Sequence, residues 1–195
     1  MTLTWTTTTT TPPVFPWIEP QNTGFLYGRF GFDQNELDRL AKAFDRVDSE
    51  NCRKFFDDTL ANMRKRGEIA PQSRFTPSTL QGVLNITTLN KYSPGLTARE
   101  VGVSQQSWAN VQSTFANPRD NKYASAVTLA DGRVFLGSNA FYISGPVAGF
   151  FGWNSTDLSG VIVHEFFHRA GLSEDQIKAL HPQIQKNCGI PGFAL

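Results

Sequence analysis

Residues 154–192 read NSTDLSGVIVHEFFHRAGLSEDQIKALHPQIQKNCGIPG, and this stretch carries the strongest pattern in the chain. Capping residues stand at positions 154–156 and Gly171 can end a helix, so we expect a helix from about Thr156 to Ala170. Apolar residues cover most of its circumference, which predicts that the helix is buried. They are Ile162, Val163, Phe166, Phe167 and Ala170.

Two histidines and a glutamate interrupt this apolar surface. His164 and His168 are four residues apart, which places them about 40° apart around a helix, so both rings face one point. Glu165 lies beside the same face. In the pattern H-E-x-x-H the imidazoles bind Zn²⁺ and the glutamate is the general base for the metal-bound water. The sequence therefore predicts a zinc site with His164 and His168 as ligands and Glu165 as the catalytic base.

The run from Val161 to Gly171 resembles the zincin metallopeptidases. The resemblance implies an α+β fold in which a small twisted sheet packs on the active-site helix and an edge strand, usually antiparallel, binds an extended peptide. It implies a zinc-dependent metalloendopeptidase with a protein or peptide substrate. Arg169 departs from the family pattern, in which the residue after the second histidine is usually uncharged.

A catalytic zinc needs a third protein ligand besides an open position. Glu174 follows His168 by six residues, with Gly171 between them. This spacing is similar to the extended metzincin motif, although that family usually has histidine at this position (aspartate in a small bacterial subgroup) and also carries a methionine turn, which is missing here. Glu174 is our leading third ligand, and Asp175 and His181 are the alternatives.

Local helix chemistry offers another interpretation of the same residues. Residues 173–176 fit a capping box, in which Glu174 is an acidic residue of the first helical turn. His181 precedes Pro182, where a helix tends to end, and would then act as a cap.

Before this stretch the chain predicts two amphipathic helices within residues 33–68. This segment holds nine acidic and eight basic residues, which we interpret as solvated helix faces. Ser49 can cap the second helix. The apolar positions at helical spacing are Leu37, Leu40, Ala41, Phe44 and Val47, then Cys52, Phe55, Phe56, Leu60 and Met63.

The middle of the chain predicts a short helix over about 78–85 and a hairpin of residues 124–129 and 133–136 around Asp131-Gly132. Residues 87–122 allow no firm assignment, and residues 140–153 suggest a buried loop or short helix. We expect residues 133–136 to be the substrate-binding strand. Tyr142 and Tyr123 are candidate donors to the oxyanion of peptide hydrolysis.

Composition limits the remaining possibilities. With 195 residues we expect one domain, residues 23–195, after a flexible Thr/Pro-rich tail or linker, residues 1–22. A formal charge of +1 argues against nucleic acid or an anionic membrane as a partner. We see no apolar run near ~20 residues and no signal peptide. The sequence leaves the oligomeric state open.

Two cysteines bear on the compartment. Cys52 and Cys188 form either a disulfide, which would indicate an oxidising compartment, or two free buried thiols. The stretch Cys52-Arg53-Lys54-Phe55, the Gly-Leu-Ser-Glu-Asp turn and the late cysteine are similar to small zincin-like domains of secreted bacterial repeat proteins. This similarity favours an extracellular protein. It also leaves the alternative of an inactive zincin-like interaction module within a larger protein.

Overall fold

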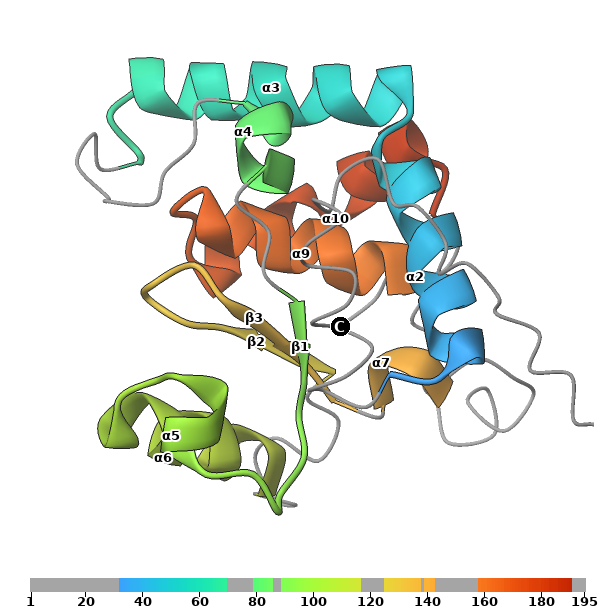
Figure 1. Ribbon diagram of the computed structural model, residues 1–195. Helices are drawn as coiled ribbons and strands as arrows, with labels where there is room; N and C mark the ends of the chain where they lie inside the picture. The colour runs from blue at the N-terminus through green and yellow to red at the C-terminus, as the bar shows by residue number, and fades with distance from the viewer. Residues whose placement is uncertain are drawn as a thin grey trace, which may run out of the picture.

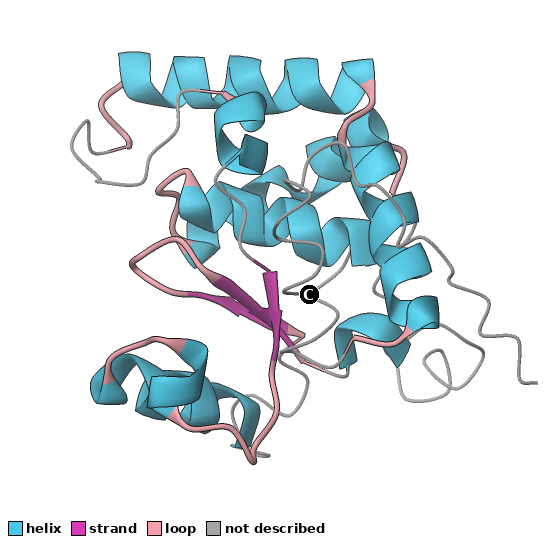
Figure 2. Cartoon of the chain, viewed as in Figure 1, coloured by secondary structure: helices cyan, strands magenta, loops and turns pink. Residues whose placement is uncertain are grey.

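The computed structural model describes residues 32–69, 79–85, 89–116, 125–137, 139–142 and 158–190. These residues form helices and a three-stranded sheet, so the α+β class is confirmed (Figures 1 and 2). The helices are α2 Gln34–Val47, α3 Glu50–Lys65, α4 Leu80–Asn85, α5 Ala98–Val101, α6 Gln105–Ala116, α7 Asn139–Tyr142, α9 Leu158–Arg169 and α10 Glu174–Cys188. The strands are β1 Leu89–Lys91, β2 Ala126–Thr128 and β3 Val134–Leu136.

Helix α9 lies at the centre of the fold. It packs against α2, α4, α7, α10 and strand β2, with the sheet on one side and α4 and α3 on the other (Figure 1). Every residue of α9 except His168 is buried. The helix therefore begins and ends close to the predicted bounds, and its apolar composition reflects contacts on all sides.

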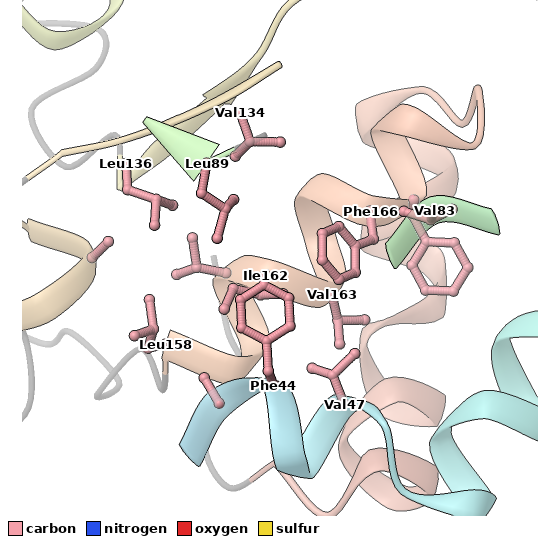
Figure 3. Packing of buried hydrophobic residues seen from close by; sticks show 14 of the residues in the cluster. Phe44, Val47, Val83, Leu89, Val134, Leu136, Leu158, Ile162, Val163 and Phe166 are labelled. Carbon is pink, nitrogen blue, oxygen red and sulfur yellow. The ribbon is translucent and has the colours of Figure 1, made fainter. Parts of the chain in front are cut away.

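The main core joins α9 to α2 and the sheet. Figure 3 shows Phe44 and Val47 of α2 beside Ile162 and Val163 of α9. Phe44 is fully buried, which contributes about 2–3 kcal/mol in transfer free energy. On the opposite side of α9, the same core includes three strand residues: Leu89, Val134 and Leu136.

The two amphipathic helices are confirmed as α2 and α3. A capping box of Asp33 and Glu36 begins α2. Ser49 occupies the N-cap position of α3, but its hydroxyl makes no capping hydrogen bond, so that part of the expectation is wrong. The apolar positions that the periodicity selects are buried, except Ala41 and Phe55, which are half-buried. Two further residues of α2, Glu36 and Ala43, are also buried and were not selected.

The predicted hairpin forms, but residues 133–136 do not lie at an edge of the described sheet. Strands β2 and β3 pair antiparallel around a turn in which Gly132 has a φ of 84°. β1 then pairs parallel with the other edge of β3, which gives the order β1-β3-β2. Residues 133–136 are therefore not an edge strand: β3 is central and buried. The parallel partner comes from the segment that had no assignment, where a three-residue strand leaves too little periodicity to detect.

Helices α5 and α6 cover the face of the sheet that points away from α9 (Figure 1). The Trp108 ring of α6 lies 5.7 Å from the Phe135 ring of β3. Its indole N–H donates to the carbonyl of Leu96 at 3.0 Å. A capping box of Thr97 and Glu100 begins α5, which explains a helix of only four residues.

A disulfide joins helices α3 and α10, which pack against each other. Cys52 near the start of α3 is bonded to Cys188 at the end of α10, so the alternative of two free thiols is wrong. The short helix predicted over 78–85 is confirmed as α4 from Leu80 onward.

Some predicted segments fall outside the part of the chain that the structure describes. They are the tail at residues 1–22, the capping residues at 154–156, residues 143–153 and Tyr123. Among the residues that are described, no helix combines the length and the hydropathy that crossing a membrane requires.

Candidate metal centre

Helix α9 presents its two histidines on one face, as the four-residue spacing requires. The rings of His164 and His168 lie 4.7 Å apart, centre to centre, at 75°. His164 is buried, with 5 % of its surface exposed, whereas His168 is half-buried. One imidazole is therefore buried in the interior, and the other is partly exposed to solvent.

The turn after α9 returns the chain toward the histidines. Gly171 has a φ of 98°, a conformation that favours glycine. Its N–H donates to the carbonyl of His168, and the N–H of Leu172 donates to the carbonyl of Phe167. This pair of bonds is a Schellman motif. The predicted stop at Gly171 is therefore confirmed, and α10 begins immediately after the turn.

Glu174 is the first residue of α10, and its carboxylate reaches both histidines. Its Oε2 atom lies 3.1 Å from Nε2 of His164 and 3.1 Å from Nε2 of His168. All three ligand atoms lie within 4.8 Å of one another. In the part of the chain that the structure describes, this is the single group of three or more His, Cys, Asp or Glu residues that converge in this way.

The capping box predicted for residues 173–176 is also present. The Ser173 hydroxyl accepts from the N–H of Gln176, and the Gln176 side chain accepts from the N–H of Ser173 at 2.8 Å. The two interpretations of this segment are therefore compatible. The box fixes the start of α10, and this start places the Glu174 carboxylate beside the imidazoles.

A second hydrogen bond defines the tautomer of His168. Its Nδ1 atom lies 3.0 Å from the carbonyl oxygen of Leu172, which can only accept. If the single proton of a neutral imidazole is on Nδ1, Nε2 carries a lone pair that faces the Glu174 carboxylate. Two electron-rich atoms at 3.1 Å need either a second proton on the ring or a cation between them. The geometry around Nε2 thus suits a metal ligand with an outer hydrogen bond.

The electrostatics of the cluster favour the protonation states that bind a metal. Burial, together with the neighbouring His168 ring, lowers the pKa of His164 to about 4, although Glu174 opposes the shift. Partial burial acts to raise the pKa of Glu174, but His164 and Lys178 outweigh it, and its pKa lies below the ordinary value. A neutral imidazole and an ionised carboxylate are the forms that coordinate metals.

Glu165 lies outside the group of three ligand atoms and is buried. Only 5 % of its surface is exposed. Burial raises the pKa of Glu165 to about 7, and a hydrogen bond from Thr128 opposes the shift. The Thr128 hydroxyl lies 2.5 Å from Oε2 of Glu165. A carboxyl group with a pKa near neutral is suited to accept and release a proton.

The alternative ligands lie outside the cluster. Asp175 is exposed at the second position of α10. The centre of the His181 ring lies 6.1 Å from that of His164, farther than the 4.7 Å between the His164 and His168 rings. The expectation that the helix ends at His181 is wrong, because α10 continues through Pro182 to Cys188. A capping box lies at the start of this helix, and the disulfide lies at its last residue.

Arg169, which departs from the zincin pattern, is buried against α4. It donates to the carbonyl of Val83 at 3.3 Å. Burial lowers the pKa of Arg169 to about 10, and Asp131 opposes the shift. Arg169 therefore attaches α4 to α9, because it supplies a hydrogen-bond donor to a carbonyl in the last turn of the short helix α4.

Two groups at the site were absent from the sequence interpretation. One is the carbonyl of Leu172, which no side-chain pattern could reveal. The other is Thr128, whose place in the hairpin was predicted but whose contact with Glu165 depends on how the sheet packs on α9. Of the expected oxyanion donors, Tyr142 is the last residue of α7, but its side chain, like the whole of Tyr123, lies outside what the structure describes.

Comparisons with known proteins add no family assignment to this geometry. No family model, no curated protein and no solved structure matches the chain. The assignment of the site therefore rests on the residues of this chain and their arrangement.

Proposed function

We propose that this protein is a zincin-like zinc metallopeptidase. His164, His168 and Glu174 would hold Zn²⁺, and Glu165 would be the general base. The observation that carries the proposal is the convergence of two imidazole nitrogens on one carboxylate oxygen, each at 3.1 Å. The Glu165 carboxyl group lies buried on the same helix.

The donor set fits zinc in particular. Two imidazoles and one carboxylate make up the three-ligand set of many catalytic zinc sites, which leave a further position open. Thiolates, which would favour a closed structural site, are excluded because both cysteines are in the disulfide. When bound, zinc polarises a carbonyl and lowers the pKa of a coordinated water to about 7.

The residues of the chain would then divide the proton transfers of peptide hydrolysis. Glu165 takes a proton from the attacking water as the oxygen bonds to the carbonyl carbon. It then delivers that proton to the amide nitrogen as the carbon–nitrogen bond breaks, so the base is regenerated. In the metal-free protein, burial already raises the pKa of Glu165 from its ordinary value.

Strand β2 is the best candidate for the strand that binds the substrate. It lies at the edge of the described sheet, it is half-buried, and it contacts α9 beside Glu165. An extended peptide could add to such an edge through main-chain hydrogen bonds, with side chains alternating in direction. This proposal replaces residues 133–136, which are central in the sheet.

The same features support the zincin-like fold and the extracellular setting that we propose. A buried H-E-x-x-H helix lies beneath a sheet whose strand beside the site is antiparallel to its neighbour. The disulfide between Cys52 and Cys188 is typical of oxidising compartments. The substrate would be a protein or peptide.

The experiment that tests the function compares wild type with Glu165→Gln on a peptide library, each loaded with zinc. We expect the variant to keep its zinc and to lose at least ~10³-fold in kcat, because a missing base removes both proton transfers. Glu50→Gln, an exposed glutamate of α3, is the matched control and should keep full activity. Zinc-loaded wild type that cleaves no peptide would instead support an inactive interaction module.

A further inference from the structure

We infer that Thr128 is a positioning residue, whose hydroxyl holds the Glu165 carboxylate and ties it to the edge strand beside the site. The inference rests on the proposed function, since it gives Thr128 a part in the same reaction. It concerns two residues that are 37 positions apart in the sequence. The packing of β2 on α9 brings them together.

The register of the sheet places the Thr128 side chain on the face that covers α9. Thr128 lies opposite Val134 in the antiparallel pair. Val134 belongs to the core cluster beside α9, as Figure 3 shows. Side chains alternate along a strand, so Val127 points to the opposite face. A shift of one residue in the register would therefore remove the hydroxyl from the site.

The contact itself is short and specific. Oγ1 of Thr128 lies 2.5 Å from Oε2 of Glu165 and 3.4 Å from the Glu165 carbonyl oxygen. The hydroxyl has one hydrogen, and the carboxylate at the shorter distance is the acceptor that we assign to it. A hydrogen bond from a hydroxyl to an ionised carboxylate is among the stronger types.

This hydrogen bond would restrict rotation of the Glu165 carboxylate, which must stay in position to act as the base. A glutamate side chain has three rotatable bonds, whereas threonine is β-branched and stiff about its first one. Occupation of Oε2 by the hydroxyl assigns Oε1 as the atom that exchanges a proton with water. Because Thr128 is part of β2, a peptide added to this strand would be held at a fixed position relative to Oε1.

The test compares Thr128→Val, which keeps the shape and removes the hydroxyl, with Thr128→Ser, which keeps the hydroxyl. We expect Thr128→Val to lower kcat by about 10–100-fold, with KM within about twofold and full zinc content. Thr128→Ser should restore most of kcat. Thr114→Val is the control, because it removes a hydroxyl that bonds to the Asn110 carbonyl in α6, away from the site.

A second readout is independent of turnover. The ¹³C signal of the Glu165 carboxyl group, assigned by its absence in Glu165→Gln, should shift in metal-free Thr128→Val and stay close to wild type in Thr128→Ser. If zinc-loaded wild type cleaves no peptide but the carboxyl signal still shifts in metal-free Thr128→Val, the proposed function is overturned. The contact between Thr128 and Glu165 would then still be supported. Unchanged kcat and an unchanged carboxyl signal in Thr128→Val would overturn the inference. So would an equal loss of kcat in the valine and serine variants.

Discussion

Nδ1 of His168 donates to the carbonyl of Leu172, four residues further along the chain, at 3.0 Å. Leu172 is also the residue whose N–H closes the turn after α9. The turn that ends the helix therefore orients one candidate ligand, His168, and places another, Glu174, beside it. The helix stop and the geometry of the proposed metal site therefore depend on the same residues.

This dependence predicts the effect of Gly171→Ala. Gly171 has a φ of 98°, so a side chain there is strained by about 1–2 kcal/mol. We expect lower stability in urea unfolding and, in addition, weaker zinc binding in competition with a chelator, because the turn positions Leu172 and Glu174.

Gly67→Ala is the matched control for this variant. Gly67 also has a positive φ, 71°, and no atoms lie within 4 Å of where its Cβ would be. We expect similar strain at Gly67 but unchanged zinc affinity. Equal zinc affinity in the two variants would contradict the coupling between the turn and the site.

The raised pKa of Glu165 predicts that the stability of the metal-free protein depends on pH. Its pKa is raised by burial from 4.5 to about 7 in the folded state. Between these values the folded protein keeps the proton and the unfolded chain releases it, so stability falls as the pH rises through this window. Glutamine cannot ionise and avoids this loss.

We therefore expect Glu165→Gln to become more stable relative to wild type as the pH rises from 4.5 to 7. The gain follows from 1.36 kcal/mol for each pKa unit and amounts to about 3 kcal/mol at most. Urea unfolding at pH 4.5, 6 and 8 in the presence of a chelator measures it. His164 is present in both proteins, so the comparison isolates Glu165. A stability difference that stays constant across this range would refute the buried, neutral carboxyl group.

We predict that removal of the disulfide lowers the stability strongly and changes the proposed metal site little. Cys52 and Cys188 are separated by 136 positions, and a loop of this length corresponds to about 5 kcal/mol at most. We expect the double variant Cys52→Ala, Cys188→Ala to lose about 2–5 kcal/mol in urea unfolding. Zinc content should remain, because Glu174 lies at the opposite end of α10. Loss of zinc under conditions where the variant is folded would show that the disulfide also shapes the site.

The buried side-chain amide of Asn90 leads us to predict a substitution that stabilises the fold. It is buried in β1 with 1 % of its surface exposed, and within the described structure neither side-chain amide atom has a hydrogen-bond partner. Burial of an unsatisfied amide costs about 1–3 kcal/mol. Asn90→Leu, which has a similar shape, should therefore raise the free energy of unfolding by about 1–2 kcal/mol. A decrease would show that the amide has a stabilising contact.

The sequence predicted those parts of the molecule that depend on local patterns. The spacing of His164 and His168, the stop at Gly171 and the capping box before Glu174 are all encoded within a few residues, and the structure places them together. The periodicity of α2 and α3 is equally local. The Asp131-Gly132 turn marked the hairpin.

The parts that the sequence could not predict depend on long-range contacts. The parallel pairing of β1 with β3 joins residues 45 positions apart, and it moves β3 from an edge to the centre of the sheet. Thr128 meets Glu165 only because this sheet packs on α9. Pro182 lies within α10, although its local preference predicts a helix end. In each case tertiary packing decides between conformations that the local sequence allows.

The most direct test of the central claim is the zinc content per chain of protein purified without a metal-affinity tag. We expect close to one zinc in the wild type, loss of zinc in His164→Ala and Glu174→Ala, and retention in Asp175→Ala and His181→Ala. This result would establish His164 and Glu174 as ligands. Wild type that contains no zinc even after refolding with the metal, or Glu174→Ala that retains it fully, would contradict the site described here.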